Sequence, residues 1–132
     1  MFSGIDHVEI VTSNIERSLN FYSEILGFTI KLRRKAQGPP REEMAFLILG
    51  DTIIELFSVK DPLPYTDQWQ VGCRRIALQT EDLDKAIEHL KAKGVEIYSG
   101  PRTTPTAKVA EIKDPDGLSI ELMQGGMARQ VI

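Results

Sequence analysis

The chain has 132 residues, of which 42% are hydrophobic and 27% charged, with a formal net charge of −3. This composition is typical of a globular protein and excludes a disordered or collagen-like chain. Because there is neither an apolar run of about 18 residues nor a basic, apolar leader, we expect no membrane partner. The mildly acidic charge also argues against nucleic acid as a partner. Cys73 is the single cysteine, so no intrachain disulfide can form, and a cytoplasmic location is expected. We expect Cys73 to be a small packing residue.

An internal repeat organises the chain, because residues 6–19 and 74–87 follow the same pattern. Each segment reads as a short apolar strand, a threonine, a polar residue and an amphipathic helix. The polar residues, Asn14 and Asp82, are suited to accept hydrogen bonds from the free N–H groups at a helix start. The two segments therefore predict the same strand–helix unit twice.

The rest of each half predicts three more strands. Each helix is expected to end at a glycine, Gly27 or Gly94, because glycine readily adopts the left-handed conformation that stops a helix. The expected strands then span residues 28–32, 44–49 and 52–57 in the first half and 95–98, 108–112 and 118–123 in the second. The last two strands of each half form a hairpin, with turns at residues 50–51 and 114–117.

Each half is thus a β-α-β-β-β module, and the predicted fold class is α+β. We expect curved, mostly antiparallel sheets around a concave pocket, with the helices outside. Residues 1–132 would form one domain, since modules of this size cannot each bury a full core. Module 1 spans about residues 4–57, a linker about 58–72, module 2 about 73–124, and a tail that frays covers 125–132.

Polar residues interrupt one face of the predicted strands. Since side chains alternate along a strand, His7 and Glu9 share one face of the first strand, opposite its apolar face. Glu55, Arg75 and Glu121 occupy the corresponding face of three later strands, and the repeat matches Arg75 to His7 and Glu121 to Glu55. Charged groups in mid-strand are costly unless solvated, paired or ligated. We therefore expect His7, Glu55, Arg75 and Glu121 to line one ligand pocket.

This layout resembles the vicinal oxygen chelate superfamily, which includes glyoxalase I, bleomycin-resistance proteins, extradiol dioxygenases and methylmalonyl-CoA epimerase. The resemblance covers about residues 4–124. It rests on Ile5-Asp6-His7-Val8, on Asn20-Phe21-Tyr22 with Leu26-Gly27-Phe28, on Asp82-Leu83-Asp84-Lys85-Ala86 and on Asp114-Pro115-Asp116-Gly117-Leu118-Ser119-Ile120-Glu121. The family takes one metal ligand from the first and last strand of each module, and in glyoxalase I these are His, Glu, His and Glu.

Carried over, the resemblance implies His7, Glu55 and Glu121 as ligands of a divalent metal, which could be nickel, zinc, cobalt, manganese or iron. Arg75 stands at the fourth ligand position, where its guanidinium has no lone pair for a metal. An ion about 4 Å from that guanidinium would be repelled by roughly 8 kcal/mol at an effective dielectric constant near 20. We therefore expect weak metal binding or none. Arg75 is either a clamp for an anionic substrate or a charge that replaces the metal.

Two functions follow from these residues. The first is a glyoxalase-like lyase or isomerase, similar to lactoylglutathione lyase, in which Glu121 or Glu55 removes a proton from an oxygen-rich substrate and an enolate or enediolate is stabilised. The second is a metal-free small-molecule binding protein of the bleomycin-resistance type. An extradiol dioxygenase is disfavoured, because its iron would need a second strand histidine. A homodimer is expected, since both modules have exposed sheet edges.

Three other features have both a functional and a structural interpretation. Basic residues in the segment 31–41 could gate the pocket or steer an anionic ligand from a mobile loop, or form a solvated strand end. Tyr65 and Trp69 in the linker could cap a pocket or cover a subunit interface. His89 follows the polar side of the second helix and is expected at the surface.

Overall fold

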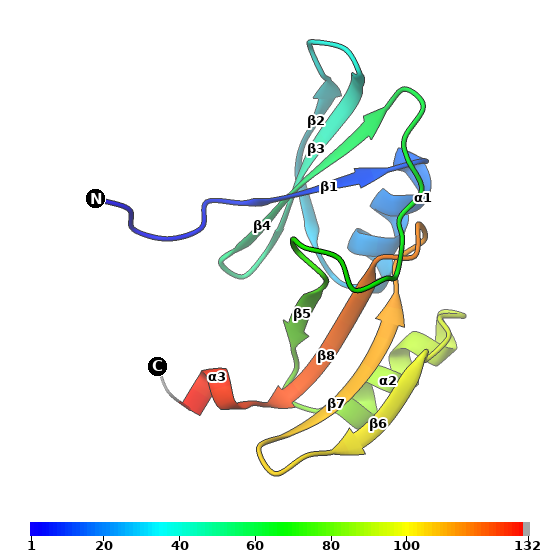
Figure 1. The fold of residues 1–132 in the computed structure, drawn as a ribbon. Helices are drawn as coiled ribbons and strands as arrows, with labels where there is room; N and C mark the ends of the chain where they lie inside the picture. Colours follow the sequence, from blue (N-terminus) through cyan, green and yellow to red (C-terminus); the bar gives the residue numbers. More distant parts are fainter. Residues whose placement is uncertain (131–132) are drawn as a thin grey trace. The chain divides into compact units, whose positions relative to one another are not determined.

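The computed structural model describes residues 1–130 and divides into two compact units, with the boundary between Pro64 and Tyr65. Each unit contains one four-stranded mixed sheet and one main helical segment, so the α+β fold class is confirmed (Figure 1). The boundary lies inside the linker predicted at residues 58–72. The single domain remains a prediction, and each unit is described here by itself.

The first unit contains a strand, a helical segment and three further strands. In chain order these are β1 (Val8–Thr12), α1 (Ile15–Asn20), the π-helical turn η1 (Phe21–Ile25), β2 (Thr29–Lys35), β3 (Arg41–Leu49) and β4 (Thr52–Val59). The sheet order is β1-β4-β3-β2, with β1 parallel to β4 and the other pairs antiparallel. The parallel pair places Glu9 beside Glu55.

The second unit repeats this topology. Its elements are β5 (Ile76–Gln79), α2 (Leu83–Ala92), β6 (Ser99–Thr103), β7 (Ala107–Lys113), β8 (Ser119–Gly125) and the short helix α3 (Met127–Gln130). The sheet order is β5-β8-β7-β6, again with the first strand parallel to the last. The repeat inferred from residues 6–19 and 74–87 is therefore a structural repeat.

The helix caps follow the sequence prediction. Asn14 accepts a hydrogen bond from the Arg17 backbone N–H at 3.1 Å, and Asp82 accepts one from the Lys85 N–H at 3.0 Å. Gly27 and Gly94 have φ angles of 89° and 79°, which is the left-handed conformation expected after a helix. These local signals fix where each helix begins and ends.

Alternation along the strands also agrees with the prediction. Ile54 and Leu56 are buried while Glu55 between them is partly exposed, and Ile120 and Leu122 flank Glu121 in the same way. One face of each sheet therefore packs in the core of its own unit. The other face carries the polar residues.

The first helical segment differs from a regular α-helix. Ile15, Leu19, Tyr22 and Leu26 recur in the sequence at the spacing of a regular α-helix. The π-turn η1 bonds the Leu26 N–H to the Phe21 carbonyl, five residues earlier. The extra residue in this turn buries Phe21 next to Tyr22, with their rings edge to face at 5.2 Å.

Two strand predictions need correction. The strand predicted at 95–98 lies further along, as β6 (Ser99–Thr103): the Val95 N–H still bonds to the Leu90 carbonyl at the end of α2, and the Tyr98 N–H is the first to bond to β7, at the Glu111 carbonyl. The predicted strand 28–32 instead begins at Thr29 and continues to Lys35. Most of the basic group therefore lies on β2 and not in a mobile loop. Arg33 explains the longer strand, since it forms ion pairs with Glu16 and with Glu43 of the neighbouring strand.

The remaining corrections concern Cys73 and the tail. Cys73 is exposed, not packed, because it precedes β5 in an irregular segment. The predicted fraying tail begins with the end of β8 and the short helix α3, while residues 131–132 lie outside the described part.

Within residues 1–130, no helix is both long and apolar enough to cross a membrane.

Candidate functional site

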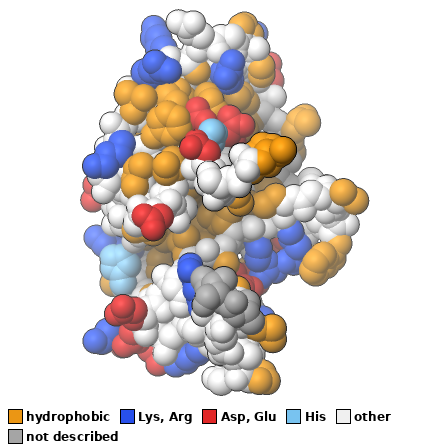
Figure 2. Space-filling view, turned by 90° about the vertical axis from the view of Figure 1, so that its left-hand side faces the viewer, with side chains coloured by type: hydrophobic (Ala, Val, Ile, Leu, Met, Phe, Trp, Pro, Cys, Tyr) orange, Lys and Arg blue, Asp and Glu red, His pale blue; other side chains and the backbone are white. Residues whose placement is uncertain are grey.

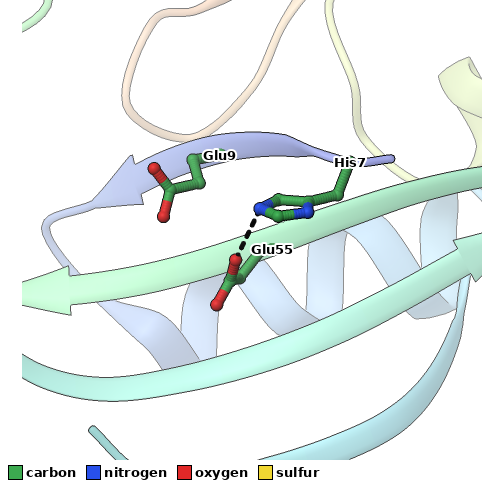
Figure 3. A group of neighbouring side chains, drawn as sticks. All are labelled: His7, Glu9 and Glu55. Carbon is green, nitrogen blue, oxygen red and sulfur yellow. Dashed lines mark ion pairs between the residues drawn. The ribbon is translucent and has the colours of Figure 1, made fainter. Parts of the chain in front are cut away.

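An ion pair between His7 and Glu55 forms the centre of the site in the first unit. His7 immediately precedes β1, and Glu55 lies on β4, the parallel neighbour of β1. His7 Nε2 lies 2.8 Å from Glu55 Oε2, and the two side chains point toward one another (Figure 3). The sequence predicted that these two residues would share a site, and the parallel pairing brings them together.

Both ring nitrogens of His7 face carboxylate oxygens, because Nδ1 also lies 2.8 Å from Asp6 Oδ2. A neutral imidazole can donate only one of these two hydrogen bonds. The second contact is satisfied by an imidazolium, by a protonated carboxyl or by a cation beside the free lone pair. The pKa of His7 is raised above 6.5, chiefly by the hydrogen bond to Asp6, despite partial desolvation, and further by the nearby charges of Glu55 and Glu9.

Glu9 joins this pair. One ligand atom from each of His7, Glu9 and Glu55 lies within 4.8 Å of the others, and Figure 3 shows the Glu9 carboxylate on the same side of the strands. Imidazole and carboxylate groups are the donors that bind divalent cations such as Zn²⁺, Mn²⁺ and Fe²⁺. We call His7, Glu9 and Glu55 the first-unit cluster. Its donor set fits the divalent metal that the fold suggests.

The first-unit cluster was only partly predicted. The alternation along β1 placed Glu9 on the face of His7, but the carried-over ligand positions did not include it. The signal that would have identified it is the spacing of two residues between His7 and Glu9, together with the parallel register that puts Glu9 beside Glu55.

Hydrophobic side chains border the cluster. Phe46, which lies opposite Glu55 on β3, packs edge to face against the His7 ring with a centroid distance of 6.2 Å. Figure 2 shows one pale-blue histidine side chain next to red acidic side chains, with orange hydrophobic side chains around them. A charged centre in an apolar border is typical of small-molecule sites.

In the second unit, one guanidinium nitrogen bridges two carboxylates. Arg75 Nη1 lies 2.7 Å from Glu111 Oε1 and 2.9 Å from Glu121 Oε2. Glu111 and Glu121 are direct cross-strand neighbours on β7 and β8, and the Ser119 hydroxyl donates a hydrogen bond to Glu111. The arginine thus neutralises two like charges that would otherwise repel each other.

Glu111 is a second residue that the sequence reasoning missed. The turn predicted at residues 114–117 implies that the hairpin strands pair around it, and that pairing places Glu111 opposite Glu121. In the first unit, the residue opposite Glu55 is Phe46. The two units therefore differ at two repeat-equivalent positions, with a histidine and a phenylalanine in one and an arginine and a glutamate in the other.

The structure thus pairs the predicted residues within units, His7 with Glu55 and Arg75 with Glu121. The shared pocket for all four remains a prediction. A hollow of about 280 Å³ lies on the polar face of the second unit, lined in part by Ala77, Met123 and Arg129.

The other singled-out side chains have local partners or lie at the surface. Trp69 stacks under the guanidinium of Arg74 at 3.8 Å, and the Tyr65 hydroxyl donates a hydrogen bond to the Arg74 carbonyl. Both contacts lie at the start of the second unit. His89 is exposed on α2, as predicted.

Comparison with known proteins agrees with this fold. Residues 4–122 match the family model described as the Glyoxalase/Bleomycin resistance protein/Dioxygenase superfamily. A lactoylglutathione lyase of Neisseria meningitidis is 33% identical over 126 residues, which cover 89% of this chain and 88% of that protein. A crystal structure of a glyoxalase family protein from Enterococcus faecalis has a TM-score of 0.83 and 29% identity, covering 92% of this chain and 98% of that one. TnmS3, an antibiotic-binding protein from Streptomyces sp. CB03234, has a TM-score of 0.73 and 25% identity, covering 95% and 98%.

Proposed function

Because this chain belongs to the Glyoxalase/Bleomycin resistance protein/Dioxygenase superfamily, we propose that it is a lyase or isomerase that acts on a small, oxygen-rich molecule through an enolate or enediolate. The observation that carries this proposal is the contact between His7 and Glu55, with Asp6 holding the other ring nitrogen. The lactoylglutathione lyase of Neisseria meningitidis, similar over most of its length, supports the same class of reaction.

His7 and Glu55 are the proposed ligands of a divalent metal, which could be nickel, zinc, cobalt, manganese or iron. Asp6 supports this role, because a carboxylate on Nδ1 fixes the ring and leaves Nε2 to face the ion. Residues that hold a divalent ion here would give the site a Lewis acid able to polarise a substrate carbonyl. Glu121 is either the third ligand or the base that removes the substrate proton.

Arg75 has a positioning role in this proposal. Its contact with Glu121 holds the carboxylate of that residue at a fixed place beside β5. The remaining guanidinium N–H groups can donate to an anionic substrate oxygen. The proposal requires that His7 and Glu55 line one pocket with Arg75 and Glu121, either within one chain or between the chains of a dimer.

A metal-free small-molecule binding protein is the second candidate. It is favoured by the contacts of Arg75, whose guanidinium pairs with the carboxylates of Glu111 and Glu121. The apolar lining of the hollow beside Met123 is compatible with holding a ligand without turnover. The similarity to the antibiotic-binding protein TnmS3 supports this candidate.

One experiment separates the two candidates. The purified protein is loaded with Ni²⁺, Zn²⁺, Co²⁺, Mn²⁺ or Fe²⁺, desalted, and assayed for metal content and for formation of lactoylglutathione. The lyase proposal predicts bound metal and turnover that Glu121→Gln lowers by about 10²-fold or more. His89→Gln, on exposed α2, is the control and should leave turnover unchanged. Ligand binding without turnover by any metal-loaded form would favour the binding protein.

We also propose that the protein is a homodimer with a small-molecule ligand as its partner, and that neither nucleic acid nor a membrane binds to it. The exposed outer strands β2 and β6 are the edges that a second copy could cover. Light scattering at micromolar concentration should give twice the chain mass of 14.8 kDa. A particle with the mass of a single chain would contradict the dimer. The cytoplasmic location stays a prediction.

A further inference from the structure

We propose that Glu9 is the third protein ligand of the metal, so that the first unit alone holds the ion through His7, Glu9 and Glu55. This inference rests on the proposed function for the identity of the bound group. It differs from the ligand set carried over from the family, because it replaces a carboxylate of the second unit by one from β1.

The first argument is the geometry of adjacent strands. Residues paired across two parallel strands have side chains on the same face, and the register pairs Glu9 with Glu55. His7 lies two residues before Glu9 and therefore projects on that face too. The three ligand atoms lie within 4.8 Å of one another, which suits ligands at about 2.0–2.2 Å from one ion.

The second argument is charge. Two glutamates and a neutral histidine give the first-unit cluster a formal charge of −2, which a divalent ion would neutralise. The Asp6 carboxylate contacts the other ring nitrogen, Nδ1, and so orients Nε2 toward Glu55. The first-unit cluster therefore has three candidate ligands and a carboxylate that fixes the orientation of its histidine.

The third argument is that Glu121, the alternative ligand in the second unit, is already engaged in an ion pair. There, Arg75 already contacts both Glu111 and Glu121, so a metal could recruit Glu121 only by displacing a half-buried guanidinium contact. Glu9 is exposed, and no such cation competes for it among the contacts described for it in residues 1–130. Glu9 can therefore complete a three-ligand site at lower cost than Glu121.

The test uses the full chain and titration calorimetry with Ni²⁺ alone and with Mn²⁺ alone at neutral pH. Glu9→Gln should weaken the affinity for both ions at least about tenfold, as should His7→Gln. Glu121→Gln should change it less than about threefold. Glu24→Gln is the matched control, since it removes one exposed carboxylate from η1 in the same unit.

A second readout separates ligation from simple charge attraction. The visible absorption of Co²⁺ depends on the atoms bound to it, so Glu9→Gln should change the spectrum of the Co²⁺-loaded protein. An affinity for Ni²⁺ within twofold of the unsubstituted protein, or an unchanged Co²⁺ spectrum, would overturn the assignment of Glu9. So would a loss in Glu121→Gln as large as that in Glu9→Gln, or an unsubstituted protein that binds none of these ions.

These outcomes can be told apart from a failure of the proposed function. If Glu9→Gln loses metal as expected but the loaded protein forms no lactoylglutathione and transforms no related substrate, the lyase proposal fails and the ligand assignment stands. If turnover occurs and Glu9→Gln keeps its metal, the ligand assignment fails and the lyase proposal stands.

Discussion

Glu111 and Glu121 lie directly opposite each other on β7 and β8, and their carboxylates contact the same nitrogen of Arg75. Like charges at directly opposed positions destabilise a sheet unless a cation lies between them. Arg75, the residue just before β5, is that cation. The arginine therefore stabilises the second unit whether or not a ligand is bound.

Replacing Arg75 with methionine should lower the free energy of unfolding by about 1–3 kcal/mol, because two half-buried carboxylates lose their shared donor. Adding Glu111→Gln in that background should recover part of the loss, since it removes one of the opposed charges. Urea unfolding followed by circular dichroism measures both effects. A double variant less stable than Arg75→Met would contradict this account of the three residues.

If residue 75 lines the metal pocket, as the proposed function requires, replacing Arg75 with histidine should add a ligand to the first-unit cluster and strengthen divalent metal binding about tenfold or more. The change removes a positive charge, adds an imidazole lone pair and frees Glu121 from its ion pair. In this background Glu121→Gln should weaken Ni²⁺ binding, although it should have little effect on the unsubstituted protein. Calorimetry of the four proteins gives this comparison directly. Equal affinity in the arginine and histidine forms would argue that the two units do not share a site.

Acid should remove the contribution of Glu16 to stability. Its hydrogen bond and ion pair with Arg33 lower the pKa of the Glu16 carboxyl below the ordinary value of 4.5. A lowered folded-state pKa means that the contribution is complete above pH 4.5 and disappears as the pH falls through the folded-state value. The unfolding midpoints of the unsubstituted protein and Glu16→Gln should thus differ at pH 7 and converge as the pH falls below 4.5. Glu24→Gln, in the adjacent helical turn, controls for the loss of one charge.

A buried hydroxyl pair anchors the end of β1. Thr12 Oγ1 and Ser18 Oγ are 2.5 Å apart, and both residues are about 1% exposed. Thr12→Val should cost about 1–3 kcal/mol of unfolding free energy, because it removes the partner of a buried hydroxyl. Thr80 is the equivalent threonine of the second unit, where its hydrogen bonds to Asp82 are 3.3 Å long. Thr80→Val should therefore cost clearly less in the same denaturation experiment.

Local signals in the sequence were sufficient for the repeat, the helix caps and the hairpins. Asn14, Asp82, Gly27 and Gly94 act through their own backbone neighbourhood, so their roles can be inferred from the residues nearby. The π-turn could not be inferred in this way. Phe21 and Tyr22 are both buried in this turn, whereas the apolar spacing alone favours a regular helix.

In the candidate site, too, some positions could be inferred from the local sequence and others depend on how distant strands pair. Alternation put His7 and Glu55 on the correct faces, and parallel pairing of β1 with β4 brings them into contact. The position of Glu9 beside Glu55 depends on the parallel register of β1 and β4, which composition and spacing do not provide. Glu111 could have been found, because the predicted hairpin turn sets its register against Glu121. Cys73 was misplaced because it lies three residues before β5, in an irregular segment that alternation does not describe.

The parallel pairing of β1 with β4 also determines when the first-unit cluster can form. His7 and Glu55 are separated in the chain by α1, η1, β2 and β3, and they meet only once β1 has aligned with β4 at Val8 and Ile54. Closing so long a loop has an entropic cost, and pairings of this kind are formed slowly during folding. A metal captured by His7 and Glu55 would therefore report the completion of the whole unit, and the nascent chain would have no such site until β4 had been synthesised.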